Sequence, residues 1–181
     1  YRLFVSGDRK PSRNGYVLSL PYPVTTEYSH PNECVVSYSE RDANPFLHLI
    51  DALWCLSGRK DLHTLRLYAK KMEDFSDDGN TLAGSYGFRW RTYFDKDQLK
   101  EVCNLLINKP HTRRAVLQMW HPNDLSEVED GLDVPCNLCA KFQIRNNGTL
   151  DMHVFNRSND IVWGLYGANC VQFGFLHQYV A

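Results

Sequence analysis

One short stretch of the chain brings together a thiol, a guanidinium, a carboxylate and an amide. Cys136 follows a proline, and Arg157 comes one hairpin later. A cysteine becomes a strong nucleophile when a neighbouring cation stabilises its thiolate, and an arginine can do this. Asp160 and Asn169 follow, and the Asn169 amide offers a donor and an acceptor side by side, which matches the amide edge of a pyrimidine. The stretch predicts covalent chemistry at Cys136.

Three helices are expected to position these groups. Apolar residues recur at helical spacing from about Pro45 to Ser57 and from about Asp97 to Asn108. Asp95 and Gln98 predict a capping-box-like start for the second of these helices. From Asn169 to Ala181 the chain is apolar on almost every side. A helix of that kind belongs in the middle of a fold.

Strands are expected beside them. Residues 115–120 have the pattern of a strand, and apolar residues alternate on both sides of Asn147-Gly148, a strong hairpin signal. Strands and helices without a βαβ rhythm predict an α+β fold, with a mixed β-sheet and a central buried helix. No repeat or linker divides the chain, so we expect a single domain over residues 1–181. Because the chain stops inside the last predicted helix, we expect its C-terminal part to be missing.

Composition limits the classes of partner. The chain has 181 residues, is 43% hydrophobic and carries a formal net charge of −1. This charge gives no general attraction to nucleic acid or to anionic membranes, so an anion site must be local. No apolar run reaches the length of a membrane span, and no signal-like leader opens the chain, although it also lacks an initiating methionine. We expect neither membrane nor nucleic acid as a partner.

The six cysteines are scattered through apolar or helical segments. This distribution is typical of reduced thiols and indicates a cytoplasmic protein. Cys136 and Cys139 form a single C-x-x-C, but a zinc site would need a second pair or suitably spaced histidines. We therefore expect no metal site and read Cys139 as a buried strand residue.

Seven separated motifs resemble the thymidylate synthase superfamily, which includes the pyrimidine-nucleotide hydroxymethylases. They occur in one order along nearly the whole chain: Arg13-Asn14-Gly15; Leu53-Trp54 with Gly58; Ser85 to Trp90; Pro110 with Arg113-Arg114; Trp120 with Pro122; Pro135-Cys136-Asn137; and Arg157 to Asp160. The resemblance implies a thymidylate synthase-like fold and a folate-dependent transfer to C5 of a pyrimidine nucleotide. It also implies a homodimer.

The resemblance assigns the phosphate site to arginines. Arg157 is implied to contact both the catalytic thiol and the nucleotide phosphate, and Ser158 to reach the phosphate as well. Arg13 and the pair Arg113-Arg114 match the remaining phosphate ligands, and in the family that pair comes from the neighbouring subunit. A guanidinium can bind a phosphate dianion through two parallel hydrogen bonds.

Five further positions match functional residues of the family. Cys136 is implied to attack C6 of the base, and Asn169 to read the base, which favours a uridylate, although the segment before Asn169 is one residue longer than the usual family form. Asp160 matches an aspartate that binds the folate pterin, and it is also a good helix N-cap. Tyr86 matches a tyrosine in a water network around the C5 proton. Asp51 stands where the family has a glutamate that acts in proton transfer.

The product depends on what accepts the one-carbon unit. The synthases usually follow the nucleophile with histidine, whereas this chain has Asn137, and residues 72–84 contain no tryptophan to exclude water. We therefore expect hydroxymethylation of dUMP with 5,10-methylenetetrahydrofolate as co-substrate. Two alternatives stay open: thymidylate synthase proper, which makes dTMP, and a catalytically silent nucleotide-binding homologue, suggested by Asp51. The sequence leaves dCMP, UMP and CMP open as substrates.

Overall fold

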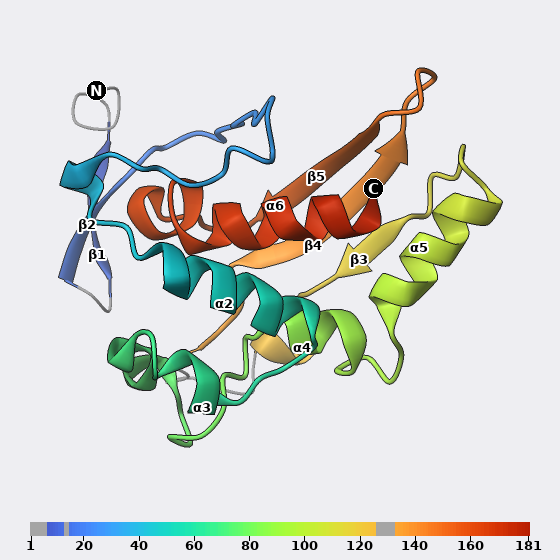
Figure 1. Cartoon of the computed structure of the whole chain (residues 1–181). Helices are drawn as coiled ribbons and strands as arrows, with labels where there is room; N and C mark the ends of the chain where they lie inside the picture. The colour runs from blue at the N-terminus through green and yellow to red at the C-terminus, as the bar shows by residue number, and fades with distance from the viewer. Residues whose placement is uncertain (1–6, 13–14, 126–132) are drawn as a thin grey trace.

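A computed structural model of the chain describes residues 7–12, 15–125 and 133–181. A short hairpin comes first, and helices and a three-stranded sheet follow it (Figure 1). The elements in chain order are β1 (Asp8–Ser12), β2 (Gly15–Ser19), η1 (Ser39–Arg41), α2 (Pro45–Leu56), α3 (Leu62–Leu65), η2 (Lys70–Phe75), α4 (Tyr86–Arg91), α5 (Gln98–Asn108), β3 (Val116–Gln118), η3 (Pro122–Leu125), β4 (Asn137–Ile144), β5 (Leu150–Asn156), η4 (Ile161–Leu165) and α6 (Ala168–Val180).

The main sheet has the strand order β3-β4-β5, and both pairs are antiparallel. Ile144 pairs with Leu150 across the predicted turn, and Gly148 has a φ of 85°, a conformation that glycine adopts without strain. The hairpin predicted around Asn147-Gly148 is therefore confirmed. The strand predicted over 115–120 is also present, as the shorter β3.

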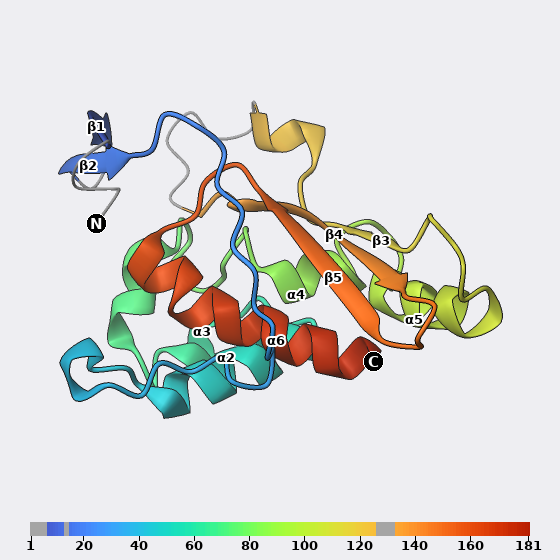
Figure 2. The same ribbon diagram turned by 90° about the horizontal axis from the view of Figure 1, so that it is seen from above.

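Helix α6 occupies the middle layer of the molecule. Seen from above, it lies between the sheet on one side and α2 on the other, and the chain that leads from β2 to α2 passes across it (Figure 2). Phe173 and Leu176 of α6 are buried in the same cluster as Ala140 and Phe142 of β4. The expected α+β fold with a central buried helix is confirmed.

One detail of the predicted helices is wrong. Asp97, not Asp95, caps α5, because its side chain accepts the backbone N–H of Lys100 at 2.9 Å, and Asp95 has a φ of 57°. The buried face of α2 mixes apolar and polar residues, while Phe46, Leu49 and Leu53 are exposed. The residues buried on it are Leu47, His48, Asp51, Ala52, Trp54 and Cys55. Helix α6 packs against α2.

No helix in the described ranges is long and apolar enough to cross a membrane.

Candidate active site

Cys136 lies immediately before β4, beside the end of β5. The backbone N–H of Arg157 donates to the carbonyl of Cys136 at 2.9 Å, which joins the two residues across the hairpin. The guanidinium then turns back: Nε donates to the carbonyl of Pro135 at 3.0 Å, and Nη2 donates to that of Val134 at 3.2 Å. The same Nη2 lies 3.8 Å from Cys136 Sγ. Arg157 is thus fixed by backbone acceptors with its charge against the sulfur.

A bulge in β4 sets the direction of the residues beside Cys136. Asn137 pairs with Asn156, but Cys139 pairs with Phe155, so one residue of β4 is left over at Leu138. Such a bulge re-aims side chains, and it often occurs next to active sites. Asn137 is only 2% exposed, and its Nδ2 has no hydrogen-bond partner among the described residues. A buried amide donor without a partner is rare and provides a polar contact for a ligand or a water.

Tyr86, the first residue of α4, lies against the same turn. Its hydroxyl is hydrogen-bonded to the backbone of Cys136 and Asn137. Burial is the main reason that the pKa of the phenol is raised well above its usual value, and the neighbouring Cys136 and Asp133 raise it further. The ring also packs against Phe173 of α6 at a centroid distance of 5.9 Å. Tyr86 therefore stays protonated and links the Cys136 turn to α6.

Asp51 lies on the buried face of α2, where it meets α6. It is 6% exposed, and Gln172 Nε2 donates to its Oδ2 at 2.6 Å. Burial raises the pKa of this carboxyl from 3.8 to about 7, and the hydrogen bond from Gln172 opposes that rise. A carboxyl that titrates near neutral pH can both accept and donate a proton there.

Asp160 and Asn169 stand at the two ends of one unusual turn. Asp160 caps η4, since its Oδ1 accepts the backbone N–H groups of Val162 at 2.8 Å and of Trp163 at 2.6 Å. η4 is a π-helix: the N–H of Leu165 bonds the carbonyl of Asp160, five residues back. A π-turn holds one more residue than an α-helical turn. The segment between Asp160 and Asn169 therefore holds one residue more than a regular α-helical turn would, directly upstream of α6.

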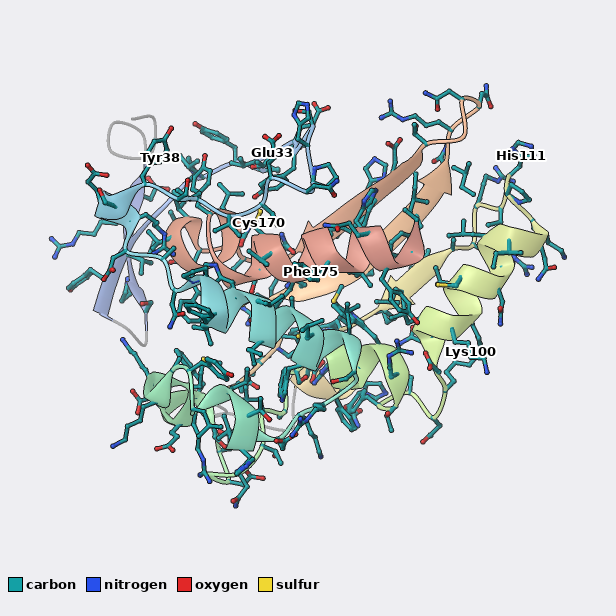
Figure 3. All side chains as sticks on the ribbon, viewed as in Figure 1. Glu33, Tyr38, Lys100, His111, Cys170 and Phe175 are labelled. Atoms are coloured by element: carbon teal, nitrogen blue, oxygen red, sulfur yellow. The ribbon has the colours of Figure 1, made fainter. Side chains whose placement is uncertain are left out.

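The extended segment before α2 holds this π-turn from outside. The hydroxyl of Tyr28 donates to the carbonyl of Leu165 at 2.5 Å and is also hydrogen-bonded to the thiol of Cys170. Arg41 Nη2 donates to the carbonyl of Val162 at 2.9 Å. Figure 3 shows Cys170 at the start of α6, below the segment that carries Glu33. These contacts fix the backbone on both sides of the turn that leads to Asn169.

The arginines of the expected phosphate site do not all lie near Cys136. Arg113 and Arg114 line a hollow of about 430 Å³ together with Lys109 and His111. Figure 3 shows that His111, which marks this hollow, lies far from Cys170 at the start of α6. Arg114 precedes Val116, which pairs with Lys141, so about seven residue positions, or roughly 23 Å, separate it from Cys136 along the sheet.

The other two phosphate candidates are placed differently. Ser158 follows Arg157 and is exposed, and Arg13 lies outside the described residues.

The described structure thus brings one group of the expected residues together. Cys136, Asn137, Arg157 and Tyr86 share contacts around one turn, and Asp51 joins them through α6. Gln172 was not predicted from the sequence, although it is the one strongly polar residue between Cys170 and Leu176. Tyr28 and Arg41 were not predicted either, and no local pattern distinguishes them. In the described ranges no group of three or more histidine, cysteine or acidic side chains could hold a metal ion.

Comparison with known proteins gives a consistent set of relatives. The sequence profile of the thymidylate synthase family matches residues 6–181. A deoxyuridylate hydroxymethyltransferase of Pseudomonas phage M6 is 50% identical over 181 residues, which is 100% of this chain and 51% of that protein. Another, from Bacillus phage SP01, is 38% identical over 169 residues, 88% of this chain and 44% of that protein.

A solved structure of the same family also resembles this chain. The crystal structure of thymidylate synthase from T4 phage matches with a TM-score of 0.59 and 28% identity, over 75% of this chain and 51% of that one. The chain spans about half the length of the curated relatives it matches.

Proposed function

Because this chain belongs to the thymidylate synthase family, whose profile covers residues 6–181, we propose that it carries the catalytic thiol of a dUMP C5-hydroxymethyltransferase. The observation on which the proposal rests is the contact between Arg157 and the sulfur of Cys136, 3.8 Å apart. The similarity to two phage deoxyuridylate hydroxymethyltransferases supports the choice of dUMP and of hydroxymethylation.

The Cys136 thiolate begins the reaction. C5 of uracil is too weak a nucleophile to take up a one-carbon unit unaided, and addition of the thiolate at C6 makes C5 enolate-like. Arg157 lies where it can stabilise the thiolate before the addition and after the bond is released. The buried Nδ2 of Asn137, which has no partner among the described residues, can donate a hydrogen bond at the substrate.

Asp51 serves the proton transfers. With a pKa raised to about 7, its carboxyl can take up or release a proton near neutral pH. Tyr86, hydrogen-bonded to the backbone of Cys136 and Asn137, keeps its own proton and holds this turn in place.

The co-substrate is proposed to be 5,10-methylenetetrahydrofolate, which supplies a one-carbon unit at the oxidation level of formaldehyde. The surface beside Asp160 fits a flat aromatic ring, because Val162, Trp163 and Tyr166 are all exposed there. Both capping hydrogen bonds of Asp160 go to Oδ1, so capping leaves Oδ2 for a ligand. Capping and folate binding are therefore compatible roles.

The fate of the C5 substituent decides between hydroxymethyl and methyl. Water as acceptor gives 5-hydroxymethyl-dUMP and tetrahydrofolate, while hydride from the folate would give dTMP and dihydrofolate. Phe75, the one aromatic residue between positions 72 and 84, is partly buried and packs against the main core. This placement favours water as the acceptor.

The phosphate site is proposed to need two copies of the chain. Arg113 and Arg114 lie roughly 23 Å along the sheet from Cys136 of their own chain, so we assign them to the site of a partner in a homodimer. Arg157, Ser158 and Arg13 are the proposed phosphate ligands of the same chain.

Product analysis tests the proposal. The natural full-length protein is incubated with methylenetetrahydrofolate and each of dUMP, dCMP, UMP and CMP, and the products are identified by mass spectrometry. We expect 5-hydroxymethyl-dUMP with tetrahydrofolate. Production of dTMP alone would establish the synthase reaction instead, and nucleotide binding without release of tritium from 5-³H-dUMP would establish a silent homologue.

A further inference from the structure

Gln172 and Asp51 form a buried polar pair at the centre of the fold. Gln172 lies on α6, one turn after Asn169, and Asp51 lies on the face of α2 that packs against α6. We propose that Gln172 is a positioning residue, which holds the Asp51 carboxyl in one orientation and directs its transferable proton to Oδ1. This inference rests on the proposed function.

The geometry of the pair determines which oxygen can carry the proton. Gln172 Nε2 donates to Oδ2 of Asp51 at 2.6 Å, in a contact that is buried on both sides. An amide nitrogen is a donor, so the oxygen that receives this bond must keep a free lone pair. In a neutral carboxyl the unprotonated oxygen is the stronger acceptor, so this hydrogen bond favours the proton of Asp51 on Oδ1. The amide thus leaves one oxygen as the site of proton exchange.

The free end of the amide distinguishes this role from simple packing. With its nitrogen directed at Asp51, Gln172 must turn Oε1 away from it. Gln172 is only 7% exposed, and its Oε1 is buried without a hydrogen-bond partner among the described residues. A purely structural glutamine would have both ends of its amide satisfied. The unused acceptor provides a site for a donor, either a water or a substrate N–H.

Among the described residues, His48, Cys55 and Tyr86 do not compete with the pair for this proton at neutral pH. On α2 the pKa of His48 is lowered by burial and by Arg41, and that of Cys55 is raised well above its usual value by burial. On α4 the pKa of Tyr86 is raised. All three side chains are therefore uncharged. From α6 the group that acts on Asp51 is Gln172, whose hydrogen bond opposes the effect of burial.

The lengths of the two side chains are matched. Asp51 is short and Gln172 is long, and together they span the gap between α2 and α6 with a bond of 2.6 Å. The double substitution Asp51→Glu/Gln172→Asn exchanges the two side-chain lengths and conserves their sum. Asp51→Glu alone adds a methylene to a closely packed site, which costs activity through misplacement of the carboxyl.

The experiment measures tritium release from 5-³H-dUMP between pH 5 and pH 9 in the natural full-length protein. Gln172→Leu removes the donor and keeps the bulk. A hydrogen bond to a charged group shifts a pKa by on the order of one to two pH units. We therefore expect the acid limb of the pH profile of kcat to move to higher pH by about that amount. We expect kcat at pH 7 to fall about tenfold, and KM for dUMP to change less than about twofold. Gln178→Leu, an exposed change on the same helix, is the matched control.

Two further measurements cover a variant that folds poorly. The double variant Asp51→Glu/Gln172→Asn should regain activity that Asp51→Glu alone loses. The Asp51 carboxyl can also be titrated directly by ¹³C NMR in the free protein and in Gln172→Asn, where we expect the same upward shift.

The outcomes separate the two claims. If the wild type is active and the Gln172→Leu variant has the same acid limb in its pH profile of kcat, the positioning role alone is overturned. A wild type that never releases tritium would overturn the proposed function and this role with it.

Discussion

The guanidinium of Arg157 lies 3.8 Å from the sulfur of Cys136 and is anchored there by two carbonyls of the residues just before that cysteine. Its carbon Cζ also lies 5.6 Å from the centroid of the Trp120 ring. Most of the hydrogen bonds of this side chain are therefore spent on holding its own position. A cation fixed in this way can act on the sulfur without first losing conformational freedom.

This anchoring predicts that charge alone will not replace Arg157. Arg157→Lys keeps a cation but cannot reproduce the planar, multiply bonded guanidinium. We expect kcat/KM for dUMP to fall at least about a hundredfold, because the cation is no longer held against the sulfur. Steady-state kinetics measure this. Arg145→Lys, at the exposed tip of the hairpin where Arg145 pairs with Asp151, is the control and should stay near wild type.

A second prediction concerns the sulfur itself. Cys136→Ser should abolish turnover and leave non-covalent dUMP binding within about threefold, since a serine hydroxyl is a much weaker nucleophile at neutral pH. The wild type with 5-fluoro-dUMP and methylenetetrahydrofolate should form a covalent adduct at Cys136, seen by mass spectrometry of the intact protein. Cys139→Ser should still form it. An adduct on Cys139, or a serine variant that turns over, would contradict the assignment of the nucleophile.

The buried carboxyl of Asp51 predicts how stability depends on pH. Its pKa is about 7 in the folded protein, and about 3.9 in an unfolded chain. Between these values the folded state keeps a proton that the unfolded state has released. The free energy of unfolding therefore falls as the pH rises through this window, by about 4 kcal/mol in total, and levels off above pH 7.

The variant Asp51→Asn removes this titration and still offers an oxygen to Gln172. Its stability relative to wild type should rise by several kcal/mol between pH 4.5 and pH 8, as measured by urea unfolding. The exposed change Asp74→Asn is the control. A constant difference between Asp51→Asn and wild type over this pH range would show that the carboxyl is not buried as described.

The helices could be predicted from the sequence more reliably than the faces they bury. The period of apolar residues located α2 within one residue at its C-terminal end, and Gly58 follows that end with a φ of 75°. The same period did not specify the buried face, because Phe46, Leu49 and Leu53 are exposed while Trp54 and Asp51 are buried. Periodicity within one helix carries no information about its neighbour, and here the neighbour α6 presents a glutamine.

The candidate site was predictable in part for the same reason. Cys136 and Arg157 flank one hairpin, so their contact follows from local pairing, as expected. The contacts of Gln172 with Asp51 and of Tyr28 with Leu165 join residues 121 and 137 positions apart. Such contacts depend on how the layers stack, which no local pattern specifies.

The bond from Tyr28 to the π-turn leads to a fourth prediction. Tyr28→Phe removes a hydrogen bond of 2.5 Å to the carbonyl of Leu165 and the bond to Cys170, and it keeps the ring. Because these bonds hold the backbone that leads to Asn169, we expect KM for dUMP to rise about five- to tenfold, equivalent to about 1 kcal/mol, with a smaller change in kcat. The exposed change Tyr38→Phe is the control. An unchanged KM would mean that the turn is held without Tyr28.

The fifth prediction follows from the position of Arg114, roughly 23 Å along the sheet from Cys136. If its guanidinium binds phosphate in the site of a partner chain, Arg114→Ala should weaken dUMP binding at least about tenfold, because a charged contact to the phosphate is lost. The variant should unfold within about 0.5 kcal/mol of wild type, since Arg114 is exposed. Lys100→Ala on the exposed side of α5 is the control.

Mixing the Cys136→Ser variant, which should not turn over, with the Arg114→Ala variant, which should bind dUMP weakly, then tests whether the site is shared when activity is measured at low dUMP. In a dimer of one Cys136→Ser chain and one Arg114→Ala chain, one of the two sites combines an intact thiol with an intact Arg114. Random exchange of subunits makes about half of the dimers mixed, so activity should return to about a quarter of wild type. If both residues of a site came from the same chain, every site would lack one of them, and the mixture would show no more than the mean activity of its parts.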